Sequence, residues 1–104
     1  MNTTSQKLPK STPWGVPDSI TELAEGIVSV STSSHGGYWI SDARLTEMPE
    51  KYRRCIYLED KPNWFEEDCA WAAVPLTWPQ YFSLEIVNRA QKTYDFATAK
   101  GWIK

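Results

Sequence analysis

Apolar and polar side chains alternate in short runs over residues 19–41, and glycine-containing segments separate these runs. Residues 27–32, IVSVST, place β-branched residues between hydroxyl side chains, a pattern typical of a half-buried strand. SITEL at 19–23 and YWIS at 38–41 are shorter runs of the same kind. We therefore predict a three-stranded antiparallel meander, with one helical turn over residues 19–26 as the alternative for its first strand.

Helical signals begin after this meander, at Asn63. Glu66 follows Asn63 by three residues, which is the spacing of a capping box. Glu66, Glu67 and Asp68 would place negative charge in the first turn, where the helix dipole favours it. We predict a helix that starts at Asn63 and ends at Pro75.

A second and longer helix is expected at the C-terminal end. Thr77 is its expected N-cap, Pro79 is tolerated in the first turn, and Gly101 fits the C′ position. Apolar residues recur at helical spacing: Phe82, Ile86, Val87, Ala90, Tyr94 and Ala97.

The remaining segments give weaker signals. After Met1, residues 1–11 contain a single large apolar residue, Leu8, so we expect a disordered lead-in before a single domain at 12–104. Residues 42–62 look irregular, with 55–59 as a further edge strand at most. The expected fold class is α+β: a short antiparallel sheet of three or four strands, a meander, with two helices packed on one face. The expected core residues are Ile27, Ile40, Trp71, Phe82, Ile86 and Tyr94.

Charge and composition exclude several classes of protein. The chain has 104 residues with 11 basic and 13 acidic side chains, so its field does not attract nucleic acid as a direct ligand. It has no apolar run near the roughly 20 residues that span a bilayer, and its first twelve residues lack the apolar centre of a signal peptide. We expect a cytoplasmic protein, without membrane contact, whose Cys55 and Cys69 are reduced thiols.

The segment SSHGG at 33–37 holds the single histidine, His35. Gly36 and Gly37 supply positive φ without strain, so we interpret them as structural turn residues of a hairpin. His35 would then be accessible at the tip of the turn or at a strand end.

Catalysis is an alternative for this histidine. His35 would act as the base and Cys69 as the nucleophile, with Glu66 as the orienting carboxylate and Glu67, Asp68 or Asp42 as alternatives for that role. Acidic neighbours of Cys69, however, raise the pKa of its thiol. One histidine and two separated cysteines form no zinc motif, and no phosphate-binding loop is present, so we expect neither metal nor cofactor.

Four motifs, taken together, resemble a small domain of unknown function found in bacteriophages, plasmids and other mobile elements. They are TPWG at 12–15, GIVSVSTSSHGG at 26–37, MPEKYR at 48–53 and WFEEDCAWA at 64–72. The resemblance covers residues 12–82 and implies no established activity. It implies a mobile-element setting in the host bacterial cytoplasm, where small proteins often modify host or defence machinery.

Two functional hypotheses follow, and a purely structural accessory domain is the remaining alternative. The first is an accessory protein that binds and modulates a host or defence-system protein by surface contact, with the oligomeric state left open. The second is a small enzyme or nucleotide-handling domain that uses His35 with the segment 66–69. In both cases we expect segments 33–38 and 64–71 to lie side by side and to form the working face. Its expected protein-binding residues are His35, Tyr38, Trp64, Glu66, Glu67 and Asp68.

Overall fold

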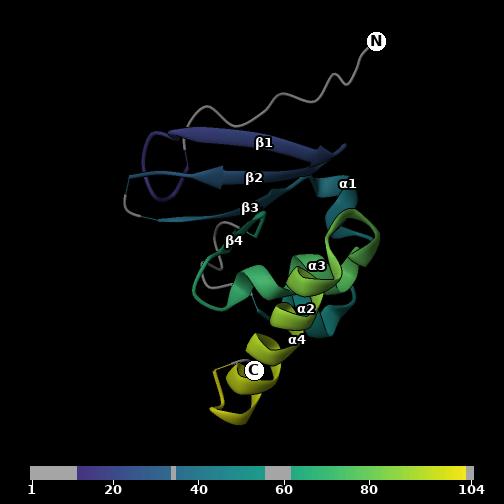
Figure 1. Ribbon diagram of the computed structural model, residues 1–104. Helices are drawn as coiled ribbons and strands as arrows, with labels where there is room; N and C mark the ends of the chain where they lie inside the picture. The colour runs from purple at the N-terminus through teal and green to yellow at the C-terminus, as the bar shows by residue number, and fades with distance from the viewer. Residues whose placement is uncertain (1–11, 34, 56–61, 103–104) are drawn as a thin grey trace.

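Four strands form one antiparallel sheet in the order β1-β2-β3-β4, with the helices on one side of it (Figure 1). The computed structural model describes residues 12–33, 35–55 and 62–102. The predicted meander and the α+β class are confirmed, and residues 19–24 form a strand rather than a helical turn. The strands are β1 Ser19–Ala24, β2 Ile27–Ser31, β3 Gly36–Ile40 and β4 Trp64–Glu66.

The fourth strand replaces the start of the first predicted helix. Trp64 and Phe65 pair with Trp39 and Tyr38 of β3, so strand pairing overrides the capping signal of the sequence. Asn63 does not cap a helix, because its Nδ2 donates to the carbonyl oxygen of Ile40 at 2.7 Å. The prediction of a helix from Asn63 is therefore wrong.

Helical structure begins later, with the 3₁₀ turn η1 at Ala70–Ala72, and continues into α3 at Ala73–Thr77. Pro75 lies inside α3 and does not end it. Its position is in the first turn of α3, where backbone N–H groups need no intrahelical partner and proline is tolerated. The predicted end at Pro75 is also wrong.

The long helix, α4 at Leu84–Ala99, begins seven residues after the predicted N-cap, Thr77. Ser83 is the N-cap, and its Oγ accepts from the Ile86 N–H at 3.2 Å. The Thr77 hydroxyl instead donates to the Ala73 carbonyl at 2.7 Å within α3, and the 3₁₀ turn η2 at Pro79–Tyr81 separates the two helices. Gly101 has φ +77° after the end of α4, which confirms its predicted C′ role.

The segment predicted to be irregular contains two short helices, α1 at Asp42–Leu45 and α2 at Glu50–Arg53. Ser41 caps α1 by accepting the Arg44 N–H on its Oγ at 3.2 Å. The expected edge strand at 55–59 falls almost entirely outside the described residues, and the expected lead-in at 1–11 falls outside them completely.

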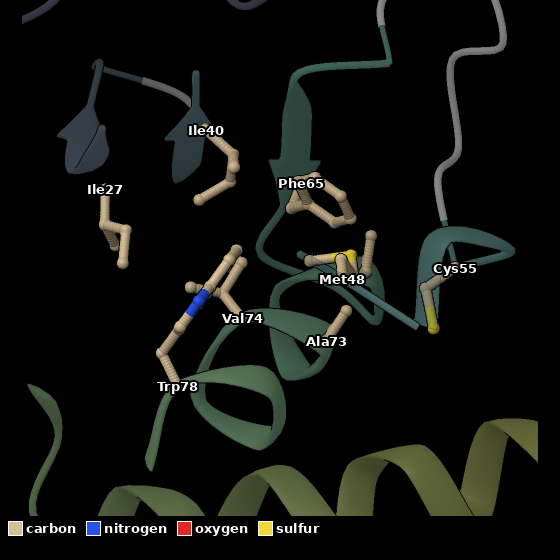
Figure 2. Close-up of a cluster of buried hydrophobic side chains, with 9 residues drawn as sticks. Ile27, Ile40, Met48, Cys55, Phe65, Ala73, Val74 and Trp78 are labelled. Atoms are coloured by element: carbon tan, nitrogen blue, oxygen red, sulfur yellow. The ribbon is translucent and has the colours of Figure 1, made fainter. Parts of the chain in front are cut away.

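The main core lies between the sheet and the helices, and Figure 2 shows Ile27, Ile40 and Phe65 directed from the strands toward α3. Ile27 and Ile40 are fully buried, as expected. Phe82 and Tyr94 are half-buried and pack against this core. Trp71 and Ile86 are also half-buried but line the pocket beside the sheet. Several members of this core were not predicted from the sequence: Met48, Cys55, Phe65, Ala70, Ala73, Val74 and Trp78.

A second apolar layer covers the other face of the sheet. Val28 and Val30 are 0% and 2% exposed, although strand alternation directs them away from Ile27 and the helices. Trp14 belongs to this layer, because its ring meets that of Trp64 edge-on with centroids 5.4 Å apart. The TPWG segment therefore packs on the sheet face opposite the helices.

Candidate functional site

A tight turn joins β2 to β3 and presents His35. The Thr32 N–H donates to the His35 carbonyl at 2.7 Å. The His35 N–H donates to the Thr32 hydroxyl oxygen at 3.0 Å, and this hydroxyl donates to the His35 carbonyl at 2.8 Å. Threonine therefore holds the turn, and His35 is exposed at the start of β3.

Gly36 and Gly37 are the first two residues of β3, so they follow the turn. Their role here is close approach. A Cβ at Gly36 would lie 3.0 Å from the Val30 carbonyl oxygen, and one at Gly37 would lie 2.8 Å from the Trp14 ring and overlap the Phe65 carbonyl. The glycines let β2, β4 and Trp14 pack tightly against β3.

The two motif segments meet through the pairing of β3 with β4. Gly37 pairs with Glu66, and the Glu67 N–H donates to the Gly36 carbonyl at 2.9 Å. His35 Nδ1 consequently lies 3.4 Å from Glu67 Oε1, with side chains 53% and 48% exposed. The expected proximity of segments 33–38 and 64–71 is present, although a strand creates it and not a helix crossing the sheet.

The predicted site residues divide between the two faces of the sheet. Tyr38 and Glu67 share the face toward the helices, whereas Trp64 and Glu66 share the face toward Trp14, because neighbouring residues of a strand point to opposite sides. Asp68 is exposed in the turn after β4. The structure therefore places Glu67, and not Glu66, against His35.

The surroundings of Cys69 disfavour a thiolate. Partial burial raises the pKa of the Cys69 thiol, and the carboxylates of Glu66 and Asp68 raise it further. Burial, followed by Asp68, also raises the pKa of Glu66, whose Oε1 accepts the Cys69 N–H at 3.4 Å. Within the described part of the chain, no hydrogen bond or ion pair joins Cys69 to His35, whose side chain contacts Glu67. Cys69 and Cys55 are both free thiols.

An open pocket of about 320 Å³ adjoins the His35–Glu67 pair, between the end of the sheet and α4. Tyr38 forms part of its wall, and burial raises the pKa of this phenol, which keeps the hydroxyl protonated as a donor and acceptor. The lining residues are Ser29, Val30, Ser31, Gly36, Gly37, Tyr38, Glu67, Trp71, Ile86 and Arg89.

Four residues of the pocket wall were not predicted as site residues: Ser29, Ser31, Ile86 and Arg89. The alternation of β2 carried a usable signal for the serines, because Ser29 and Ser31 fall on the same face as Ile27. No sequence signal marked Arg89, since its place in the pocket wall depends on how α4 crosses the sheet.

Within residues 12–33, 35–55 and 62–102, no three His, Cys, Asp or Glu side chains gather as a metal site requires. Over the same residues, none of the helices has the length and apolar character needed to cross a membrane.

Comparison with known proteins gives one assignment. Neither the curated proteins nor the solved structures contain a significant match to this sequence. The match to a known family spans residues 7–103, nearly the whole chain. The protein therefore belongs to the DUF7007 family, a domain of unknown function.

Proposed function

We propose that this protein is a binding module that recognises another protein through the rim surface, defined as His35, Tyr38, Glu67, Asp68 and Trp71. The observation that carries the proposal is the half-exposed His35–Glu67 contact beside an open pocket. Exposed polar groups next to partly buried aromatic rings are typical of protein-recognition surfaces.

The proposed partner is a host or defence-system protein in the bacterial cytoplasm, which the rim surface would modulate by contact. This part of the proposal rests on the resemblance of the four sequence motifs to domains of mobile elements. The carboxylates of Glu67 and Asp68 further favour a partner with a basic contact surface, because complementary charges speed association and select partners.

A small enzyme or nucleotide-handling domain is the second candidate, and the pocket beside His35 is the observation that favours it. Catalysis would use His35 with Glu67 as general base and orienting group. The raised pKa of the Cys69 thiol counts against a cysteine nucleophile, because the thiolate is the reactive form. We therefore rank recognition above catalysis.

Site-specific photocrosslinking in host cells tests the binding proposal. A photoreactive phenylalanine replaces Asp68 at the rim surface in one variant and Glu50 in the control. Glu50 is the first residue of α2, and Figure 1 shows this helix away from the β2–β3 turn. We expect a discrete crosslinked host protein from position 68 only.

The crosslink must also depend on the His35–Glu67 pair. His35→Ala in the position-68 variant should remove the crosslinked product while the melting temperature stays close to that of the parent, because exposed ion pairs contribute only about 0–1 kcal/mol. Equal products from positions 50 and 68, or no product from either position, would contradict recognition through the rim surface.

A further inference from the structure

We infer that the pocket beside Glu67 binds a guanidinium group, supplied by an arginine side chain of the protein partner. The inference rests on the proposed function and adds the chemistry of the contact. Its basis is the combination of a carboxylate with an unused oxygen, neutral hydroxyl groups, an aromatic side chain and a small volume in one pocket.

The carboxylate of Glu67 is available to a ligand. Its Oε1 has one long contact, 3.4 Å to His35 Nδ1, and among the described residues its Oε2 has no partner. A guanidinium donates two parallel N–H bonds to a carboxylate, a geometry that an ammonium group does not reproduce. Glu67 is therefore suited to hold arginine in preference to lysine.

The other walls match the remaining features of a guanidinium. Ser29, Ser31 and Tyr38 offer hydroxyl oxygens that accept hydrogen bonds, and guanidinium has five N–H donors to satisfy. Trp71 adds an aromatic side chain, the best type of ring for attracting a cation. Ile86 contributes apolar surface for the methylene stem of the arginine.

The charge balance favours a cation despite Arg89 in the wall. Arg89 already has a carboxylate partner, with its Nη2 3.9 Å from Oε2 of Glu85. Glu67 is the other charged residue of the wall, and Asp68 adds a second exposed carboxylate next to it in the chain. The local sum over Glu67, Asp68, Glu85 and Arg89 is negative.

The size of the pocket restricts the ligand to a small group. Its volume of about 320 Å³ is at the lower end of the range of about 300–1,000 Å³ for ligand pockets. The pocket is also open to solvent, so a side chain presented by a second protein can enter it directly. A large dinucleotide cofactor would not be enclosed.

Titration of the full chain with N-acetyl-arginine amide, followed by nuclear magnetic resonance, tests the inference. We expect millimolar binding that shifts the signals of Tyr38, Glu67 and Trp71. N-acetyl-citrulline amide, which has the same shape without the charge, should bind at least about tenfold more weakly, because charge-assisted hydrogen bonds are about twice as strong as neutral ones. Glu67→Gln should weaken arginine amide to the same extent, and the exposed-carboxylate control Glu50→Gln should not.

Three results would overturn the inference: no shifts at the pocket, equal affinity for the citrulline compound, or preferential binding of N-acetyl-glutamate amide at Arg89. These outcomes are separate from the crosslinking result. A rim crosslink without arginine binding would remove the inference and leave the proposed function intact. Arginine binding without a rim crosslink would leave a guanidinium-binding pocket but would remove the protein partner, and with it the proposed function.

Discussion

At the scale of single residues, Gly37 is the position where the backbone of β3 tolerates no side chain. A methyl group there would press on Trp14 at 2.8 Å and on the Glu66 Cα at 2.9 Å. We expect Gly37→Ala to lower the free energy of unfolding by about 1–3 kcal/mol, as overpacking does. Urea denaturation measures the loss. Ser33→Ala, at an exposed position of the same hairpin, is the control and should change stability by less than about 0.5 kcal/mol.

Glu66 gives a pH-dependent prediction. Burial raises its pKa above the ordinary 4.5, so the folded state favours the protonated acid and loses stability as pH rises through the folded pKa. Glu66→Gln removes this penalty and keeps an acceptor for the Cys69 N–H. The variant should melt at a higher temperature than the parent at pH 7, and the difference should shrink below pH 4.5, where the acid is protonated in both states.

Glu47 is the matched control, because its pKa is shifted in the opposite direction from that of Glu66. The hydrogen bond from Trp78 Nε1, 2.9 Å long, lowers the pKa of Glu47 below 4.5, and Arg44 adds to this effect. The ionised carboxylate therefore stabilises the fold above pH 4.5, and this contribution is lost as pH falls through the lower folded pKa. Glu47→Gln should lower the melting temperature at pH 7. If Glu66→Gln and Glu47→Gln changed the melting temperature in the same direction and by the same amount, the pKa differences would not be its cause.

At the scale of elements, α4 begins at the N-cap Ser83 and not at the predicted N-cap, Thr77. Ser83 Oγ receives the Ile86 N–H, so Ser83→Ala should lower the free energy of unfolding by about 1 kcal/mol, the usual cost of losing an N-cap. Ser83→Asp keeps an acceptor at the cap and should retain the parent stability. Urea denaturation followed by circular dichroism measures both, and a neutral Ser83→Ala would contradict this assignment.

The elements also show which sequence signals were sufficient. The meander was predictable because β2 alternates and because short turns connect it to both neighbours. The segment at 63–66 was not predictable, since Asn63 and Glu66 have capping-box spacing while the aromatic residues Trp64 and Phe65 also favour a strand. What decides between them is pairing with β3, a contact that local patterns do not contain.

At the scale of the whole molecule, the sequence predicted the fold class and the meeting of the two motif segments. It did not predict the pocket, which needs β2, β3, the residues after β4 and α4 at once. Nor did it predict the covered outer face, where Val28 and Val30 are buried. Both features depend on packing between distant elements, and a pattern of neighbouring residues records such packing only indirectly.

The short length of β4 has a consequence for local stability. β4 has three residues and lies at the edge of the sheet, where its pairing with β3 and the fully buried side chain of Phe65 hold it in place. His35 and Glu67 are 32 positions apart in the chain and meet only while β4 is docked. If this one strand detached, Glu67 would separate from His35 and the rim surface and its pocket would be lost. The three-stranded meander would stay hydrogen-bonded. The site therefore persists only as long as β4 stays paired with β3. Amide hydrogen exchange measures the opening of this pair separately from global unfolding.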